Sequence, residues 1–338
     1  MENVMIQAAK GQRTNVTPIW IEVQMLVTPE HKKLTEKYGF AGIVKNAELA
    51  AISTVEPVEK LGVDAAILFS DLLAPAEAMG INVEYSLNGP SITNPVRSLK
   101  DVEKLVFPDP EEGMKIWLDT IRISKRELAG KAPIIGWVGA PFGMGSFIVE
   151  GGRPAPFRNI KRIMYREPKI IHSLFEKLSE MAIRFLEAQI EAGAEIAMLF
   201  DIVAGFLAPE DYREFCYPYI KRIAREIKKK NVPLIYHSRG FNFLKYIKDT
   251  EIDVVGIDET IDISDAIEIL EGKKTIQGNL EPYVLFAEDK FIKERTEAIL
   301  DAAAKAPAHI FALGGWILRD TPFEKAKYLV EVVHNYKR

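Results

Sequence analysis

Cysteine is nearly absent from the sequence, since Cys216 is the only one among 338 residues. One thiol cannot close an internal disulfide, and it cannot supply the cysteine sets of structural zinc or iron–sulfur sites. The sequence also lacks HxH and HExxH patterns, and it has no run of about 18 apolar residues of the kind that spans a membrane. We therefore expect no metal site, no membrane span and a reducing cytoplasm as the compartment.

An excess of charge of one sign is also missing. Lys and Arg number 44 against 48 Asp and Glu, for a formal net charge of −4, and no basic block or basic stripe with interleaved aromatics occurs. This balance argues against nucleic acid as a partner. The first residues, MENVMIQAAKGQRTN, lack the apolar core of a signal peptide, which also indicates the cytoplasm. A small molecule is the expected partner.

Eight short apolar runs alternate with longer amphipathic stretches. Runs that are apolar throughout are typical of strands covered on both faces, and hence of a parallel sheet. The stretches between them carry apolar residues at three- and four-residue spacing, which predicts crossover helices. Eight repeats without a GxGxxG turn favour a closed (β/α)8 TIM barrel over an open sheet, as a single domain over residues 1–338 with an N-terminal helical extension. The runs span residues 17–24, 63–69, 132–140, 195–203, 232–240, 253–259, 274–280 and 309–315.

Catalytic side chains of such a barrel lie at the carboxyl ends of its strands. His237 and Glu259 end the fifth and sixth runs, which would be neighbours in the barrel. A carboxylate that accepts a hydrogen bond from imidazole holds its tautomer and raises its pKa, as a general base near neutral pH requires. We predict such a dyad. Because neighbouring strand residues alternate in direction, one of the two side chains pointing outward is the alternative.

Several blocks of the sequence carry a family resemblance. They include GVDAAILFSDLLAPAEAMG (62–80), GAPFGMGSFIVEGG (139–152), AQIEAGAEIAMLFDIVAG (188–205) and QGNLEP (277–282). With them the chain resembles the uroporphyrinogen decarboxylase family nearly from end to end. The resemblance implies a cofactor-free enzyme of tetrapyrrole biosynthesis, a barrel fold and a homodimer. It also implies a role for Asp71, which matches the aspartate that binds the pyrrole nitrogens in that family.

Other functional positions of that family are changed here. After Trp20, where the family carries an arginine-rich motif that holds the substrate's carboxylates, this chain reads IEVQMLVTPEH. The family's active-site tyrosine, serine and histidine match Phe147, Ile202 and Gly315, and its tryptophan after strand six matches Glu259. Burying a carboxylate without a paired cation costs several kcal/mol. The changes therefore predict a pocket that rejects uroporphyrinogen.

The leading hypothesis is a reused barrel, altered by divergence or, as we favour, by redesign, that acts on an apolar or aromatic small molecule. Its chemistry would be proton transfer, with Glu259 or His237 as base and Arg239 or Asn242 as hydrogen-bond donor. No cofactor is expected. The other predicted pocket residues are Glu22, Gln24, Met144, Phe147, Ile202, Phe241 and Trp316.

Three alternatives remain open. The native decarboxylase reaction could persist, with Asp71 at its centre and nearby arginines in place of the missing ones. Corrinoid-dependent methyltransferases, from the same superfamily, bind zinc through a His-x-Cys pair at the end of strand five, where this chain reads His237, Ser238 and Arg239. A binding protein would take up its ligand without turnover.

Overall fold

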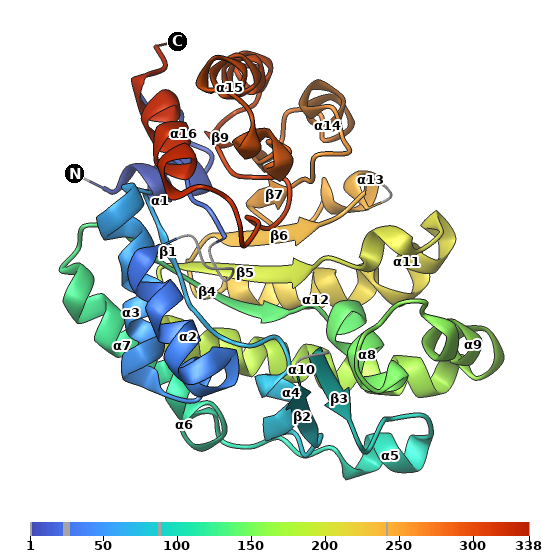
Figure 1. Cartoon of the computed structure of the whole chain (residues 1–338). Helices are drawn as coiled ribbons and strands as arrows, with labels where there is room; N and C mark the ends of the chain where they lie inside the picture. Colours follow the sequence, from blue (N-terminus) through green and yellow to red (C-terminus); the bar gives the residue numbers. More distant parts are fainter. Residues whose placement is uncertain (1, 23–27, 87–88, 241–242, 338) are drawn as a thin grey trace.

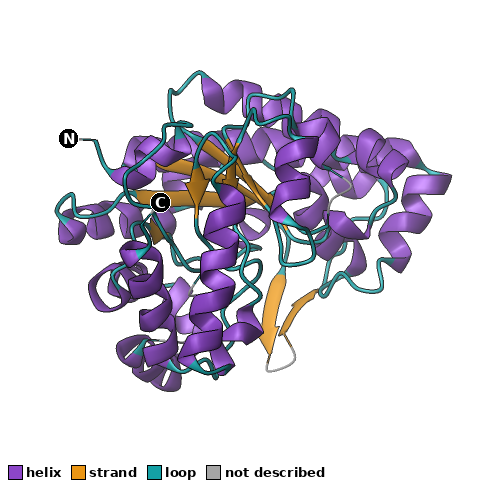
Figure 2. Ribbon diagram, turned by 90° about the horizontal axis from the view of Figure 1, so that it is seen from above, coloured by secondary structure: helices purple, strands orange, loops and turns teal. Residues whose placement is uncertain are grey.

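A curled parallel sheet surrounded by helices forms the body of the molecule (Figures 1 and 2). The computed structural model describes residues 2–22, 28–86, 89–240 and 243–337. Seven strands of the sheet follow one another in chain order, with a separate hairpin inserted after the first. They are β1 (Ala66–Ile67), β4 (Ile134–Gly139), β5 (Ile196–Asp201), β6 (Leu234–Ser238), β7 (Val254–Gly256), β8 (Thr275–Gln277) and β9 (His309–Ile310).

A short segment before β1 closes this sheet on itself. Ile19 forms a parallel bridge with Phe311, just beyond β9, and the Trp20 amide donates to the Phe311 carbonyl at 3.2 Å. On the other side, the amide of Asp64 donates to the Ile19 carbonyl at 2.8 Å. The segment therefore lies between β9 and the start of β1 and serves as the eighth extended segment of the barrel. The predicted (β/α)8 barrel is confirmed.

Helix α10 (Pro168–Ala192) illustrates how the sequence sets the helical layer. Its buried residues Ile171, Leu174 and Leu178 recur at three- and four-residue spacing, so one face of the helix is apolar and packs on β4 and on neighbouring helices. The helix ends before Gly193, whose φ of +123° is a conformation that glycine adopts at little cost. This matches the crossover helix predicted there.

The remaining helices surround the barrel or cap its ends. The first of them, α1, packs against β9 with Met5, Ala8 and Ala9 fully buried, ahead of the closing segment. They are α1 (Val4–Ala9), α2 (Pro29–Val44), α3 (Ala47–Leu61), α4 (Ala74–Ala78), α5 (Leu99–Lys104), α6 (Pro110–Gly113), α7 (Lys115–Leu128), α8 (Pro141–Glu150), α9 (Arg158–Arg166), η1 (Ala204–Phe206), α11 (Pro209–Phe215), α12 (Tyr217–Lys228), α13 (Leu244–Ile247), α14 (Ile263–Ile269), η2 (Pro282–Phe286), α15 (Asp289–Ala303) and α16 (Phe323–Asn335).

One element was not predicted. Strands β2 (Val83–Ser86) and β3 (Gly89–Ile92) form an antiparallel hairpin that projects from the body (Figure 2). The Ile92 amide donates to the Gly151 carbonyl at 3.0 Å, which ties the hairpin to the end of α8. The hairpin escaped prediction because its strands are short, partly exposed and lack an apolar run.

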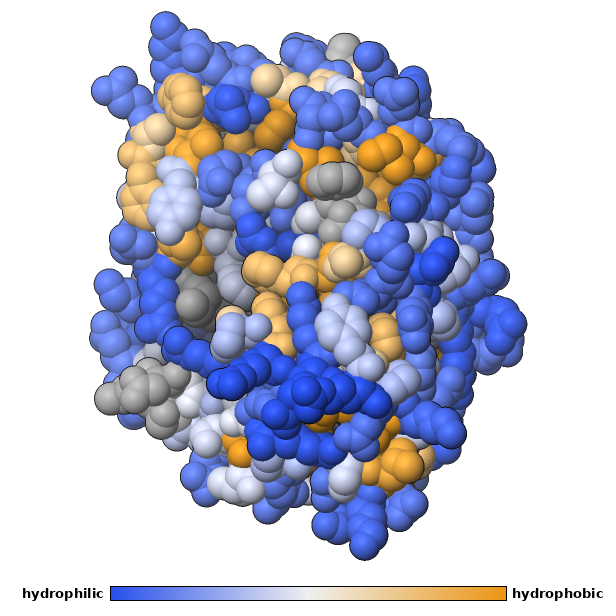
Figure 3. All heavy atoms as spheres, turned by 90° about the vertical axis from the view of Figure 1, so that its right-hand side faces the viewer, coloured by the Kyte–Doolittle hydropathy of each residue, from blue (hydrophilic) through white to orange (hydrophobic). Residues whose placement is uncertain are grey.

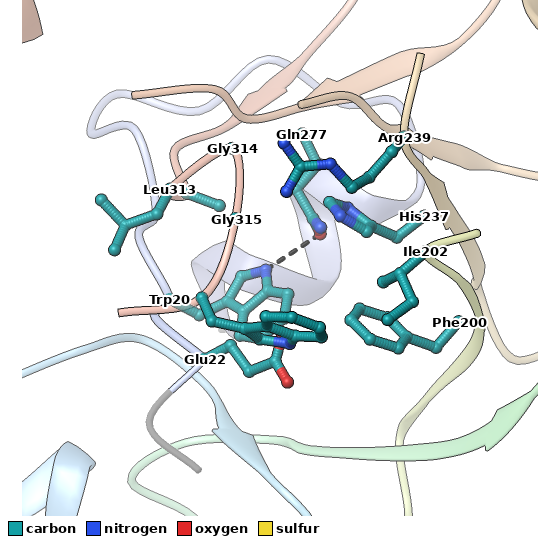
Figure 4. Close-up of a pocket in the computed structure, with 12 residues that line it drawn as sticks. Trp20, Glu22, Phe200, Ile202, His237, Arg239, Gln277, Leu313, Gly314 and Gly315 are labelled. Atoms are coloured by element: carbon teal, nitrogen blue, oxygen red, sulfur yellow. Dashed lines mark hydrogen bonds between the residues drawn. The ribbon is translucent and has the colours of Figure 1, made fainter. Parts of the chain in front are cut away.

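A buried hydrogen bond crosses the barrel interior behind the strand ends. The indole N–H of Trp20 donates to the Gln277 side-chain oxygen at 2.9 Å (Figure 4). Trp20→Phe removes the donor and leaves a buried amide oxygen unsatisfied, so we expect the free energy of unfolding to fall by about 1–3 kcal/mol in urea denaturation. Adding Gln277→Leu should recover part of the loss. A double variant less stable than Trp20→Phe alone would contradict this role for the bond.

Candidate active site

A pocket opens at the carboxyl ends of the strands, the end to which the arrows point in Figure 1. Figure 3 looks onto this side of the molecule, where hydrophobic patches are separated by hydrophilic side chains. The pocket walls come from the closing segment, from β5, β6 and β8, and from the chain after β9 (Figure 4). The described lining residues are Trp20, Glu22, Phe200, Ile202, His237, Arg239, Gln277 and residues 312–316.

Aromatic rings make up much of the pocket wall. Phe200 stacks on His237 with ring centroids 5.3 Å apart, and it lies 6.4 Å from the ring of Trp316. Trp316 is 41% exposed and stands at the mouth. The pocket has a volume of about 20 Å³, roughly the space of one water molecule, so only a small chemical group enters it without movement of the walls. These walls suit a flat ring that places one substituent inside.

Arg239 supplies a positive charge that two carboxylates already compensate. Its Nε lies 3.4 Å from Asp258 Oδ2, and its Nη2 donates to Glu259 Oε1. Asp258 in turn accepts from the Gly240 amide at 3.0 Å and from the Thr260 hydroxyl at 2.6 Å. Arg239 is the only cation among the described residues that line the pocket. Its surroundings therefore carry no net positive charge.

The predicted dyad of His237 and Glu259 does not form. Glu259 pairs with Arg239 instead, and Nδ1 of His237 has no hydrogen-bond partner among the described residues. The imidazole packs between the Phe200 ring and Gly256, where a Cβ would lie only 2.4 Å from Nδ1. Burial lowers the pKa of His237 to about 4, so the ring is neutral at pH 7. The nearby guanidinium outcompetes the imidazole for the carboxylate because it carries a permanent charge.

Two buried acids, one of them in the pocket, hold a proton more strongly than usual. Burial raises the pKa of Glu22 to about 8, against the opposing effect of a hydrogen bond with the Trp316 side chain. Burial also raises the pKa of Asp201 to about 7, and the Tyr236 hydroxyl donates to that carboxyl at 3.2 Å. Glu22 therefore enters the pocket mainly as a neutral acid at pH 7, able to donate a proton.

The structure brings a first group of the predicted site residues to this single pocket, and Glu259 adjoins it through Arg239. The residues lining the pocket are Glu22, Ile202, His237, Arg239 and Trp316. Three further predicted residues, Gln24, Phe241 and Asn242, lie outside the described residues.

A second group lies elsewhere. Asp71 follows β1 and lines a separate cavity of about 320 Å³, together with Lys45 and Glu77. Its Oδ2 has no hydrogen-bond partner among the described residues, and burial raises the pKa of Asp71 to about 6. Met144 is fully buried and Phe147 packs against the main core, because α8 directs both into the packing around the barrel.

Phe200 lines the pocket but was not predicted from the sequence, and the same holds for Trp20, Gln277, Ala312 and Leu313. A simple signal would have found the first. Side chains two apart on a strand share a face, and Phe200 with Ile202 lines the pocket as His237 does with Arg239. Gln277 and Leu313 carry no comparable signal, since their place depends on barrel closure.

Within the described part of the chain, no three His, Cys, Asp or Glu side chains come together as a possible ligand set for a metal ion. None of its helices combines the length and the apolar composition that a membrane crossing requires.

Comparison with known proteins gives a consistent result. The family model described as uroporphyrinogen decarboxylase matches residues 2–336. Proteins named uroporphyrinogen decarboxylase from Carboxydothermus hydrogenoformans and Myxococcus xanthus are 40% and 41% identical, over 99% of this chain and 96% and 97% of their own lengths. One from Geobacter sulfurreducens is 39% identical over 99% of this chain and 98% of its own.

Solved structures share the fold at lower identity. A methyltransferase from Methanosarcina mazei superposes with a TM-score of 0.82 at 20% identity, covering 97% of this chain and 96% of that one. A B12-independent methionine synthase from Shewanella superposes with a TM-score of 0.57 at 10% identity, covering 96% and 95%. At these identities the likeness extends to the fold alone.

The pKa of Glu22 predicts how stability varies with pH. Between its ordinary value of 4.5 and about 8, the folded chain keeps a proton that the unfolded chain has released. The free energy of unfolding should therefore fall as pH rises through this window, by about 1.4 kcal/mol per unit from this group. Glu22→Gln stays neutral, so its stability should fall less between about pH 5 and about pH 8 in urea denaturation. Parallel curves for both proteins would contradict the raised pKa.

Proposed function

Because the chain belongs to the uroporphyrinogen decarboxylase family, we propose that it is a decarboxylase that converts carboxymethyl groups of uroporphyrinogen to methyl groups. One observation carries the proposal: relatives 39–41% identical over almost their whole length bear that name. This supports the persistence of the family reaction better than it supports the reused barrel that the changed positions suggested.

The reaction needs protons and a place for a ring. The bond between the carboxyl carbon and the CH2 carbon breaks, CO2 leaves, and the carbon takes up a proton in its place. Glu22, a mainly neutral acid in the pocket, is the proton donor in this proposal. Asp71, which follows β1, matches the family's aspartate at the pyrrole nitrogens. It lines a cavity separate from the pocket of Glu22, so this proposal gives it no part in the proton transfer.

The pocket walls suit a flat ring. Phe200, Trp316 and the neutral ring of His237 provide apolar faces for a flat pyrrole.

A second candidate rests on the charges of the site. Arg239 is the only cation among the described lining residues, and Asp258 and Glu259 already pair with it. A neutral or cationic aromatic molecule would enter without any charge exchange. The chemistry would then be proton transfer, with Glu22 as the proton donor, because the low pKa of His237, about 4, makes its imidazole a weak base.

An anaerobic incubation with uroporphyrinogen decides between the two. We expect intermediates with fewer carboxylates and finally coproporphyrinogen, measured by chromatography after oxidation to porphyrins. Glu22→Gln should lower kcat by about 100-fold, because the proton donor is lost. Glu180→Gln, on the outer face of α10, is the matched control and should leave kcat unchanged. Folded protein that yields no product with fewer carboxylates would reject the decarboxylase and favour the second candidate.

A further inference from the structure

The two carboxylates that hold Arg239 are unequally anchored. The Asp258 side chain is 2% exposed and also accepts from the Gly240 amide at 3.0 Å and from Thr260 at 2.6 Å. The Glu259 side chain is 14% exposed, and its Oε1 accepts from Arg239. Its Oε2 has no partner among the described residues. Releasing Asp258 breaks several hydrogen bonds, whereas releasing Glu259 breaks its contact with the guanidinium alone among those described.

Two glycines keep the space beside this pair free of side chains. A Cβ on Gly315 would lie 3.4 Å from Arg239 Nη1 and 3.6 Å from Glu259 Oε2, and one on Gly314 would lie 2.8 Å from the same oxygen. The contacts with Asp258 and Glu259 use Nε and Nη2. Nη1 therefore lies beside the glycine wall of the pocket, and Figure 4 shows Arg239 over the pocket next to His237.

From this arrangement we propose that Glu259 occupies the place of a ligand carboxylate, and that Arg239 binds one carboxylate of the substrate by exchanging Glu259 for it. Asp258 stays in place and keeps the guanidinium oriented during the exchange. A planar carboxylate fits the fork of a guanidinium in the same way whether it belongs to a side chain or to a ligand. The substrate class is a flat aromatic ring that bears a carboxymethyl group.

The size of the pocket supports entry of one group at a time. The pocket has a volume of about 20 Å³, so no more than one small group enters before the walls move. The Glu259 carboxylate, which contacts Arg239, is the group whose movement the exchange requires. The ring itself would lie against Phe200 and the half-exposed Trp316 at the mouth. Any other carboxylates on the ring stay in water, where they need no cation. The inference rests on the proposed function, and it explains how a polycarboxylate can use a site with one arginine.

The exchange predicts that a variant that loses the ion pair between Glu259 and Arg239 binds its ligand more tightly. Removing the charge of Glu259 should improve binding of an acid, because the ligand no longer competes for Arg239. Isothermal titration calorimetry on the full chain with indole-3-acetate, and with neutral indole-3-acetamide, measures this. Glu259→Gln should bind the acid about tenfold more tightly than the unchanged chain does, with the amide changed less than about twofold. Glu259→Asp, which keeps the charge on a shorter side chain, should show a smaller gain.

The opposite variant tests the cation. Arg239→Gln should abolish the preference for the acid over the amide, whereas Glu180→Gln, which removes a surface carboxylate paired with Arg222, should change neither affinity. The exchange is overturned if Glu259→Gln fails to bind the acid more tightly, or if Arg239→Gln keeps the preference. It is also overturned if tryptamine, the cationic analogue, binds better than the acid and weakens in Glu259→Gln, since the pocket would then be a cation site.

The binding experiment and the decarboxylase experiment can each reject its own proposal without deciding the other. Calorimetry with the indole ligands does not depend on turnover, so an absence of decarboxylation leaves its result standing. Turnover of uroporphyrinogen together with unchanged acid binding in Glu259→Gln would reject the exchange and keep the decarboxylase.

Discussion

The pairing of Ile19 with Phe311 is the contact on which the rest of the site depends. It closes the sheet between β9 and the start of β1, and it brings Glu22 to the same opening as residues 312–316. Without closure, the ends of β5 and β6 would be exposed to water. The raised pKa of Glu22 and the lowered pKa of His237 both follow from that enclosure, because burial disfavours the charged form of each group.

The electrostatics of the pocket follow a common pattern. The ionisable groups that face it are either neutralised by burial, as Glu22 and His237 are, or compensated by a neighbour, as Arg239 is. A site of this kind tolerates an anion only where it can replace a charge already present. Membership of a decarboxylase family and the scarcity of cations are therefore compatible if the substrate carboxylate enters singly and takes over an existing ion pair.

Much of the fold was predictable from local pattern. Each of the eight apolar runs occurs as a strand or, for the closing segment, as a bridged extended stretch, and the pocket lies at the predicted ends of the strands. The site was predictable only in part. Glu22, Ile202 and Trp316 were expected to share a pocket and do, whereas Asp71 faces a separate cavity. Spacing along the chain indicates which end of the barrel a residue reaches, but not which side of a loop its side chain takes.

Sequence by itself determined the class of fold, the family and the residue types available for chemistry. Apolar periodicity and the blocks that resemble the family both depend only on residues close together along the chain. Tertiary structure alone decided which charged groups pair. His237 lies in β6 and Glu259 follows the adjacent β7, yet Glu259 contacts Arg239, since the guanidinium lies between Asp258 and Glu259 where the chain leaves β6 and β7. Charge pairing depends on distances of a few ångströms between side chains, and those distances are set only when the barrel closes.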